Sequence, residues 1–365
     1  MTVLSRRLAW ITACLAVALL GTMETFAQPK RTATTLFYMT NREVDFQSFK
    51  AHLDQISIVG PQVFSVADDG VVWGQIDPRV LTLARAHNVQ VMPLIRNPGF
   101  DQEVFHKLLH DPAACARTIA TMVDLAREHD FYGWQFDFEN IHLSDRDALT
   151  LFYRETAEAL HAEGFKLSIA VVPAHGQAGA TPYHQFMQAN WRGGFDVKAL
   201  AEIGDFISLM TYDQHTRNTP PGPVSGLPWM KTMLDYALAQ GVPPEKLSMG
   251  IPSYSRHWYA THNETKSLHA TARGLDHATA ISLVERYDVD LVWLDKQGAS
   301  YGIWTNRGTF EYLFLEDRRA FDAKLDLFES YEGLHGISVW VLGLEDPGIW
   351  DVLRDRVEPI RFGRR

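Results

Sequence analysis

The sequence predicts an α/β protein in which eight parallel strands and their intervening helices close into a (β/α)8 TIM barrel. Beyond the N-terminal region, short runs rich in β-branched and aromatic residues alternate with amphipathic helical stretches, which is the pattern of a parallel α/β architecture. Eight such runs occur, and eight strands in this order close a barrel more naturally than they form an open sheet. One α/β barrel can occupy about 250 residues or more, so a chain of 365 residues does not require two large domains.

The expected strands are short apolar or alternating runs, each bounded by turn residues or by the start of a helix. They lie at 35–40, 56–66, 89–97, 133–140, 165–173, 205–213, 246–254 and 336–346. The second strand continues into a possible hairpin through Asp68, Asp69 and Gly70, because Asp-Gly is a turn signal. We expect the chemistry at the carboxyl ends of these strands, where barrel enzymes place their active sites.

The expected helices follow the strands and show apolar residues at helical spacing. They lie at 46–56, 78–87, 144–163 and 227–241, with further helical stretches before His129 and a short helix from Pro347. Pro78 opens its helix, since proline fits the first helical turn, and Gly164 and Gly241 end theirs. The longest insertion, at about 255–335, separates strands seven and eight, and its sequence predicts a small α+β lobe followed by a barrel helix.

The first 27 residues predict a secretory signal peptide, and residues 28–365 the mature barrel domain. Arg6 and Arg7 precede an apolar run over 8–20, and small residues then lead to a cleavage site after Ala27, which is the order of a secretory signal. The run is shorter than the about 20 residues that a membrane span needs, although an uncleaved anchor is the alternative. We therefore expect export to the periplasm or the extracellular space, with no stable membrane span after cleavage.

The charge and the cysteine content limit the class of protein further. A net charge of −10 argues against a nucleic-acid partner, since contacts with the phosphate backbone need clustered Lys and Arg. Cleavage after Ala27 would remove Cys14 and leave Cys115 alone, so no intramolecular disulfide could form. Cys115 lies in a helical pattern, and we expect it to be a small core residue rather than a nucleophile.

The fourth expected strand, GWQFDFEN at 133–140, carries the candidate catalytic residues. Because side chains alternate along a strand, Gln135, Asp137 and Glu139 share one face and aromatic side chains share the other. The polar face then points into the barrel, where an unpaired carboxylate costs on the order of several kcal/mol to bury. An internal salt-bridge or hydrogen-bond network is one explanation. General acid catalysis is the favoured one, because one carboxylate raises the pKa of its neighbour and keeps it protonated.

This strand resembles the signature of glycoside hydrolase family 18, the chitinase-like family, in which alternating acidic residues end in the catalytic Glu. Asp137 and Glu139 match its last two acidic positions. LMTYDQH at 209–215 is similar to the family's strand-six motif Met-x-Tyr-Asp, and KLSMGIPSYSRHW resembles its seventh strand. GISVWVLGLED resembles its eighth strand, with Trp340 at the aromatic floor position. The resemblance spans roughly 35–353 and is strongest to the bacterial branch that includes spore-cortex and peptidoglycan N-acetylglucosaminidases.

The resemblance implies retaining, substrate-assisted hydrolysis of β-linked N-acetylglucosamine glycans. Glu139 would protonate the glycosidic oxygen while the substrate's own 2-acetamido oxygen attacks the anomeric carbon and forms an oxazolinium, so no enzyme carboxylate is the nucleophile. Asp137 would orient the acetamido group, and Tyr212 would hydrogen-bond the acetamido oxygen. Glu139 would then act as the base that activates water.

The same resemblance implies residues that bind the sugar. Asp213 would fix the bound sugar, and Trp340 would offer it an apolar face. Tyr38 ends the first strand, Trp229 follows the strand-six loop, and Met210 belongs to the strand-six motif, so these three are further candidates for the cleft.

Two departures from the family pattern lie on the fourth strand. Tyr132 stands at the first acidic position and Gln135 at the middle one. A glutamine cannot share a proton with Asp137 as a carboxyl group can, but it can donate a hydrogen bond that keeps Asp137 oriented. We therefore keep Gln135 among the substrate-site residues and expect both departures to change the rate and the pH profile rather than the reaction class.

Neither a metal nor another cofactor is expected. His106 and His110 have the i, i+4 spacing of helical metal ligands, but no third ligand is evident nearby in the sequence, and a solvated helix face is the favoured explanation. The histidines of the insertion show no metal-site spacing. An unrelated metal-dependent hydrolase would need a set of histidine and carboxylate ligands that the sequence does not display.

Two functions of the predicted barrel are weighed. The favoured one is hydrolysis of a polysaccharide that contains N-acetylglucosamine, by a monomeric protein. The alternative is a non-catalytic chitinase-like glycan-binding protein, which Tyr132 and Gln135 leave open. Intact Asp137, Glu139 and Tyr212 disfavour that alternative. Peptidoglycan, chitin and other polymers, and endo and exo cleavage, are not distinguished by the sequence.

Overall fold

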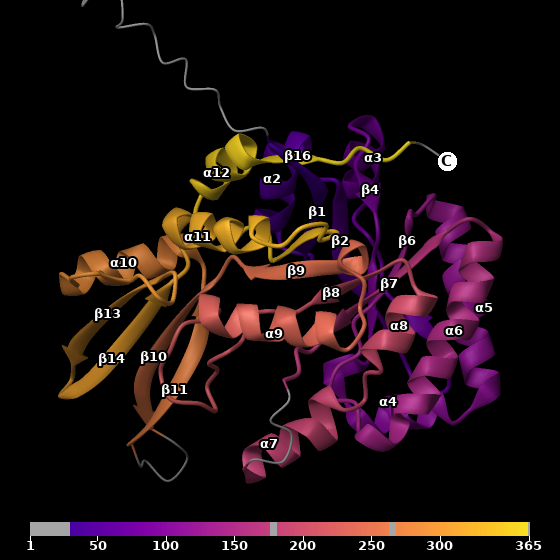
Figure 1. Ribbon diagram of the computed structural model, residues 1–365, viewed down its shortest axis with the longest axis horizontal. Coiled ribbons are helices and arrows are strands. Elements are labelled where there is room, and N and C mark those ends of the chain that lie inside the picture. The colour runs from indigo at the N-terminus through magenta and orange to yellow at the C-terminus, as the bar shows by residue number, and fades with distance from the viewer. Residues whose placement is uncertain (1–29, 176–180, 263–267, 364–365) are drawn as a thin grey trace, which may run out of the picture. The chain divides into compact units, whose positions relative to one another are not determined.

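Eight parallel strands form a closed barrel in the computed structural model, which describes residues 30–175, 181–262 and 268–363 (Figure 1). They are β1 (Arg31–Met39), β2 (Ile58–Val66), β5 (Leu94–Arg96), β6 (Gly133–Phe136), β7 (Lys166–Val171), β8 (Phe206–Leu209), β9 (Leu247–Pro252) and β15 (Gly336–Trp340). The strands are hydrogen-bonded in this order, and β15 pairs with β1 to close the ring, with Thr34 opposite Gly336. The predicted (β/α)8 TIM barrel is therefore confirmed. The proposed signal peptide, residues 1–27, lies outside the described residues.

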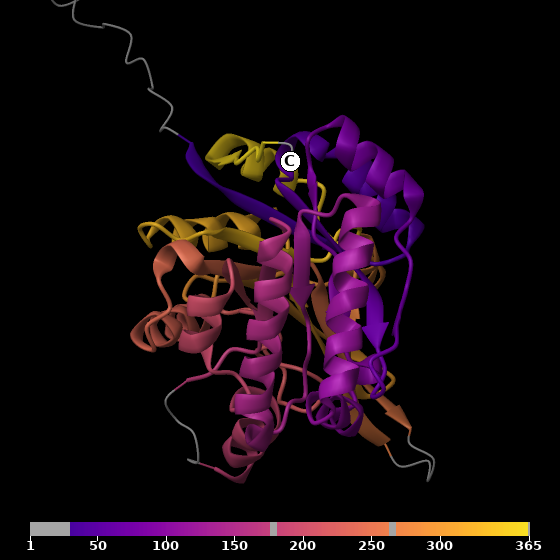
Figure 2. The same cartoon turned by 90° about the vertical axis from the view of Figure 1, so that its right-hand side faces the viewer.

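Helices lie between successive strands and cover the outside of the barrel (Figures 1 and 2). The longer ones are α2 (Glu43–Ala51), α3 (Pro78–Ala86), α4 (Gln102–Leu109), α5 (Pro112–His129), α6 (Arg146–Ala162), α8 (Val197–Ile203), α9 (Leu227–Ala239), α11 (Arg318–Glu329) and α12 (Ile349–Arg356). Side chains of both layers, among them Phe37, Trp134 and Leu325, form the main core between strands and helices. Gly164 and Gly241 adopt positive φ values of 76° and 97° just beyond α6 and α9, as their sequence positions predict.

The strand boundaries differ from the predicted ones where the hydrogen-bonded ladder stops. Three further short strands of the described chain join the barrel sheet: β3 (Val72–Trp73), β4 (Gln90–Val91) and β16 (Val357–Pro359). The predicted hairpin is confirmed, because β3 pairs antiparallel with β2. Pro93, which has no N–H, separates β4 from β5 within the third predicted strand. β6 ends at Phe136 rather than at 140, because its pairing with β5 ends there.

An α+β lobe is inserted between β9 and α11, as predicted. Within the described ranges its antiparallel sheet consists of β10 (Ser255–His262), β11 (Leu268–Leu275), β12 (Val292–Leu294), β13 (Ala299–Asn306) and β14 (Thr309–Leu315). The helix α10 (His277–Tyr287) packs on this sheet through Leu283, which joins Trp304 and Leu313 in a core of the lobe's own. Figure 1 shows the lobe extending to one side of the barrel strands.

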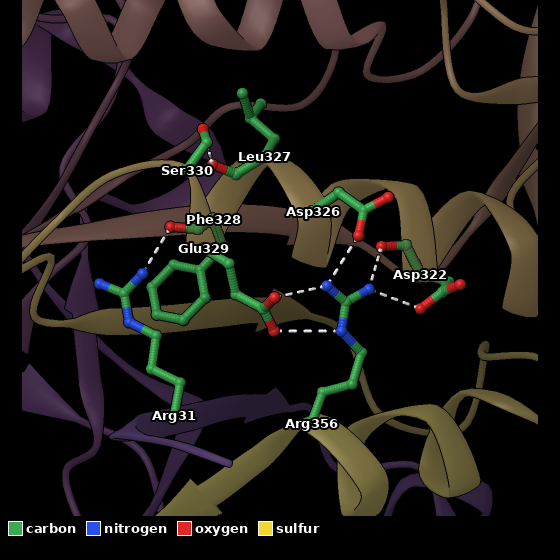
Figure 3. Close-up of polar contacts among 8 residues, drawn as sticks. All are labelled: Arg31, Asp322, Asp326, Leu327, Phe328, Glu329, Ser330 and Arg356. Atoms are coloured by element: carbon green, nitrogen blue, oxygen red, sulfur yellow. Dashed lines mark hydrogen bonds and ion pairs between the residues drawn. The ribbon is translucent and has the colours of Figure 1, made fainter. Parts of the chain in front are cut away.

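Two arginines fasten α11 to the elements beside it (Figure 3). Arg356 at the end of α12 forms ion pairs with three carboxylates of α11, at N–O distances of 2.6–2.7 Å. These are Asp322, Asp326 and Glu329. Arg31 of β1 donates to the carbonyl oxygen of Phe328 at 2.7 Å, and its guanidinium lies 3.9 Å from the centre of that residue's ring. The last two helices and the first strand are thereby held together.

Cys115 is the core residue that its helical pattern predicts. It is buried in α5, and its Sγ donates to the carbonyl oxygen of Leu108 at 3.2 Å. Burial raises the pKa of the Cys115 thiol to about 11, so it has little of the thiolate that a nucleophile needs. In the part of the chain that the structure describes, we find no helix both long and apolar enough to cross a membrane.

Candidate active site

Asp137 lies directly beyond β6 at the carboxyl end of the barrel. Its backbone N–H donates to the carbonyl oxygen of Ile95 at 2.9 Å, which extends the β5–β6 ladder by one residue. The side chain is buried, and Gln62 Nε2 donates to Asp137 Oδ2 at 2.7 Å. Gln62 sits at an irregularity of β2, where the register with β5 shifts between Gln62 and Phe64. Such a bulge re-aims a side chain. Gln62 was not among the predicted site residues, and its one sequence signal is a polar residue within an apolar strand.

Glu139 is held at its backbone by a side chain from the neighbouring strand. Asn97, which follows β5 and is fully buried, donates from Nδ2 to the Glu139 carbonyl oxygen at 3.0 Å. Its Oδ1 accepts from the Glu139 N–H at 3.2 Å. This two-way contact fixes the chain where no strand pairing remains. Among the described residues no side chain hydrogen-bonds the Glu139 carboxyl group, which is partly exposed and therefore available to a bound molecule.

The two carboxyl groups have raised pKa values. Burial raises the pKa of Asp137 to about 7, against the opposing effects of the Gln62 hydrogen bond and the Arg96 charge. Burial also raises the pKa of Glu139 well above its ordinary value, and the charges of Asp137 and Asp213 raise it further. A carboxyl group in that state keeps its proton near neutral pH, as a general acid must.

Tyr212 follows β8 and lies close to this pair. Burial raises its pKa well above the ordinary value, and the charges of Asp137 and Glu139 add to that shift, so its hydroxyl remains a hydrogen-bond donor. The ring packs against β9 where Gly250 stands: a Cβ there would lie 3.0 Å from Tyr212 Cε1 and 2.4 Å from a backbone oxygen. A glycine on β9 thus leaves the room that this tyrosine occupies.

Trp340 and Tyr38 form an aromatic pair at the ends of β15 and β1. Their ring centroids are 5.4 Å apart, with Trp340 partly exposed and Tyr38 buried. The Tyr38 hydroxyl donates to Ser208 Oγ at 2.9 Å, and Ser338 Oγ lies 2.5 Å from Ser208 Oγ. Polar side chains of several strands are therefore linked below the aromatic pair, inside the barrel. The partly exposed indole has the apolar face that a sugar ring can stack on.

Comparison with known proteins identifies the family. The family model described as Glycosyl hydrolases family 18 matches residues 35–345.

The chain belongs to glycosyl hydrolase family 18.

Relatives and solved structures agree with this membership. The Bacillus subtilis protein named uncharacterized glycosylase YvbX is 23% identical over 350 residues, 94% of this chain and 97% of the relative. The cortical fragment-lytic enzyme of Bacillus subtilis is 27% identical over 310 residues, 84% of this chain and 69% of the relative. The spore cortex-lytic enzyme SleL of Bacillus cereus superposes with a TM-score of 0.82 at 23% identity, covering 92% of this chain and 77% of SleL. A chitinase from Chromobacterium violaceum superposes with a TM-score of 0.78 at 24% identity, covering 89% of this chain and 98% of the chitinase. These two structures share the fold.

Gln135, at the middle acidic position of the family 18 pattern, hydrogen-bonds a serine of the next strand rather than Asp137. It is fully buried, and its Nε2 donates to Ser168 Oγ at 2.9 Å. The register places Gln135 opposite Ser168 on β7, so the nearest acceptor is that serine hydroxyl rather than the carboxyl group one pleat farther along. Gln62 of β2 supplies the hydrogen bond to Asp137 instead.

Tyr132, at the first acidic position of the family 18 pattern, lies at the opposite end of β6 from the carboxylates. Its ring centroid is 5.0 Å from that of Phe362, which the C-terminal segment brings to the barrel. Both rings pack against the small apolar cluster inside the barrel, which includes Leu36 and Met92. An aromatic residue here fills the barrel floor where the family pattern has an acid.

The Asp213 side chain is exposed, and its carboxylate is hydrogen-bonded by two side chains. It follows Tyr212 with a φ of 59°, and its carboxylate accepts hydrogen bonds from the Tyr254 hydroxyl and from the Arg256 guanidinium. Tyr254 and Arg256 lie at the junction of β9 with the lobe, so Asp213 connects the loop that follows β8 to the insertion. Its charge also contributes to the raised pKa of Glu139.

The two remaining predicted sugar-binding residues take different positions. Met210 is buried immediately after β8, and its N–H donates to the carbonyl oxygen of Val171 at 3.0 Å. Trp229 is partly buried near the start of α9 and packs against the core between barrel and helices. The structure therefore brings Met210 into the strand-end region, whereas the described contacts of Trp229 are those of a packing residue.

Among the described residues, one group of histidine and carboxylate side chains is close enough to hold a metal ion. It consists of His106, His110 and Asp145, and contains neither Asp137 nor Glu139.

Proposed function

We propose that this family 18 protein is a retaining glycoside hydrolase that cleaves β-linked N-acetylglucosamine glycans of the peptidoglycan or chitin type by substrate-assisted catalysis. The observation that carries the proposal is the pair of neighbouring carboxyl groups at the barrel mouth. Glu139 has a pKa well above its ordinary value, and its partly exposed carboxyl group accepts no hydrogen bond from a side chain within the described ranges. Asp137 beside it is buried and oriented by Gln62.

In this mechanism the protonated Glu139 donates its proton to the glycosidic oxygen as the bond to the anomeric carbon breaks. The acetamido oxygen of the sugar attacks that carbon from the opposite face and forms an oxazolinium. Asp137, ionised, accepts a hydrogen bond from the acetamido N–H and offsets its developing positive charge. The Tyr212 hydroxyl, which stays protonated, donates to the acetamido oxygen. Glu139 then takes a proton from water, which opens the intermediate with net retention.

Two partly or fully exposed side chains at the barrel mouth would contact the bound sugar. Trp340 offers its partly exposed indole face to the sugar, supported from below by Tyr38. Asp213 contacts the sugar through its exposed carboxylate, while Arg256 and Tyr254 hold it in place. The names of the relatives, which include cortical fragment-lytic enzymes and chitinases, support a polysaccharide substrate.

Export is part of the proposal, because cortex and chitin polymers lie outside the cytoplasm. The N-terminal order of two arginines, an apolar run and small residues before Ala27 supports a cleaved signal. Fractionation of cells that express the whole chain, followed by N-terminal sequencing of the exported form, tests this step. A chain that begins at Gln28 outside the cytoplasm agrees with the proposal, and a full-length cytoplasmic chain contradicts it.

The substitution Glu139→Gln separates the hydrolase from a non-catalytic glycan-binding protein. The amide keeps the size of the side chain but cannot donate a carboxyl proton, so hydrolysis of chitin oligosaccharides should fall by at least about 10³-fold, allowing about 10²–10⁴ for each proton-transfer role. Binding of the same oligosaccharides, measured by calorimetry, should remain. If the unchanged protein and Glu139→Gln both bind the oligosaccharides and neither hydrolyses them, the protein is a non-catalytic glycan-binding protein.

A thiazoline analogue of N-acetylglucosamine tests the intermediate. Its fused five-membered ring has the shape of the oxazolinium, and transition-state-like compounds bind about 10²-fold or more tighter than substrates. We expect competitive inhibition by the analogue and weaker inhibition of Asp137→Ala, which loses the partner of the acetamido nitrogen. An active enzyme that is insensitive to the analogue would contradict substrate assistance while leaving the hydrolase in place.

A further inference from the structure

Two histidines of one helical turn meet a carboxyl group that is distant in the sequence, where α4 contacts the start of α6. His106 lies on α4 and His110 caps the C-terminus of that helix one turn later, with their ring centroids 4.5 Å apart. Asp145 precedes α6 and follows the segment that carries Glu139. Its Oδ1 lies 2.8 Å from His106 Nδ1 and 3.1 Å from His110 Nε2. The helical spacing of the two histidines thus gains the third group that the sequence does not reveal.

The burial of the three groups is that of a site open on one side. The Asp145 side chain is 2% exposed, whereas those of His106 and His110 are 50% and 52% exposed. Asp145 stands at the N-cap position of α6, where an aspartate ordinarily accepts hydrogen bonds from the first helical N–H groups. Here its side chain makes no such capping bond. The carboxylate is instead directed at the two histidines.

The ligand types and distances match a late first-row divalent cation such as Zn²⁺. Zn²⁺ binds imidazole nitrogen and carboxylate oxygen at about 2.0–2.2 Å in a tetrahedral arrangement, which sets neighbouring ligand atoms about 3.3 Å apart. The three ligand atoms all lie within 4.8 Å of one another. Small rotations of two half-exposed imidazoles therefore suffice to close the site, and water can fill the fourth position.

We propose that His106, His110 and Asp145 form a Zn²⁺-binding site that fastens α4 to the segment between β6 and α6. The helix α4 already contacts this segment at a second point, since Gln102 Nε2 donates to the carbonyl oxygen of Asn140 at 3.1 Å. A metal bound at Asp145 adds a connection five residues farther along the same segment. The site is independent of the proposed hydrolysis, and its expected effect is on stability.

The test is calorimetric titration of the purified, untagged, chelator-treated protein with ZnCl₂, together with its thermal unfolding. We expect one Zn²⁺ per chain and a rise in Tm with added Zn²⁺, because a cation that binds the folded state stabilises it by mass action. His106→Gln and His110→Gln should each weaken binding by more than about tenfold, because loss of even a residue that supports a metal ligand costs about 10–100-fold in affinity. The double variant should neither bind at that site nor gain in Tm.

His161→Gln is the matched control. His161 Nε2 also lies 2.9 Å from a carboxylate, that of Asp205, but no third ligand group completes a site there among the described residues. This variant should bind Zn²⁺ as the unchanged protein does. The apo variants should unfold cooperatively, since the altered histidines are half exposed. Absence of Zn²⁺ binding to the unchanged protein, or equal binding and stabilisation in the double variant, would overturn the proposal.

Discussion

Asp137 is unfavourable for folding in the ionised state in which it would act, whereas Glu139 would act first in the protonated state that burial favours. Burial raises the pKa of Asp137 to about 7, and it raises the pKa of the neighbouring Glu139 as well. An ordinary aspartate loses its proton near pH 4 in an unfolded chain. Between these pH values the folded protein holds the proton and the unfolded chain does not, so the free energy of unfolding falls as pH rises from about 4 to about 7.

Replacing Asp137 by Asn should therefore stabilise the protein and inactivate it. The amide keeps a carbonyl oxygen for the hydrogen bond from Gln62 and has no proton to lose. The Tm of Asp137→Asn should exceed that of the unchanged protein at pH 8 and match it near pH 4, where both side chains are neutral. Hydrolysis should fall by roughly 10²-fold or more, on the scale of one lost electrostatic group in an active site. A lower Tm of the variant at pH 8 would contradict the cost assigned to Asp137.

Arg96 should set the pH range of activity. Its charge lowers the pKa of both Asp137 and Glu139, so the substitution Arg96→Gln raises both values. Both limbs of the pH–rate profile should then move to higher pH, which is measured from kcat/KM over pH 4–10. Arg79→Gln is the control, because Arg79 is exposed and paired with Asp77 and Glu43. A shift of the profile to lower pH in Arg96→Gln would contradict the assigned charge effect.

The alternation of strand residues predicted Asp137 and Glu139 but not the residues that position them. Period two is a property of one strand, so it identified the polar face of 133–140. Gln62 acts from β2, two strands away from β6, and Asn97 acts from the end of the adjacent β5, so their contacts exist only after the barrel has closed. The partner of Gln135 has the same origin, because Ser168 lies across the sheet on β7. Asp145 likewise became the third partner of two histidines through packing alone.

At the scale of elements, one buried ion pair joins the lobe to a barrel helix. Lys324 Nζ of α11 lies 2.6 Å from Glu316 Oε2, and the two side chains are 0% and 4% exposed. Glu316 directly follows β14, and its N–H donates to Ser255 Oγ at the start of β10. Burial raises the pKa of Glu316 to about 7 even beside the lysine. The pair thus sits where the two lobe strands return to the barrel.

Removing one partner of this pair should destabilise the protein in a pH-dependent way. Lys324→Met leaves Glu316 buried without its counter-charge, and breaking a buried pair costs about 3–5 kcal/mol. The loss should be full at pH 8 and smaller at pH 5, where Glu316 holds a proton, as measured by urea unfolding. The double variant Glu316→Gln with Lys324→Met should recover most of the stability. A loss that is the same at both pH values would contradict the role given to the uncompensated charge.

Element positions were predictable because each barrel strand and long helix has its own period or boundary residue. Pro78 and the glycines after α6 and α9 marked their helix ends as local backbone chemistry requires. The ends of β6 and the existence of β16 were not predictable in this way. A strand ends where its neighbours stop pairing, and β16 is a three-residue strand that exists through its pairing with β1.

At the scale of the whole molecule, closure of the barrel assembles the candidate site from six strands. Asp137 and Glu139 follow β6, Gln62 lies on β2, Tyr212 follows β8, and β9 leaves room for its ring. The aromatic pair comes from the first and last barrel strands, which meet only because β15 pairs with β1. The fold class was predictable from the order of eight strands, and the site's general location from the rule that barrel chemistry lies at strand carboxyl ends.

The central claim is that this barrel hydrolyses an N-acetylglucosamine polymer with Glu139 as the acid. The most direct measurement incubates the protein from Gln28 onward, and its Glu139→Gln variant, with purified peptidoglycan and separately with chitin oligosaccharides, and identifies the products by mass spectrometry. We predict fragments that end in reducing N-acetylglucosamine, formed by the unchanged protein and not by the variant, and the preferred polymer is the one cleaved faster. Products that form equally with Glu139→Gln, or none from either polymer while binding persists, would contradict the claim.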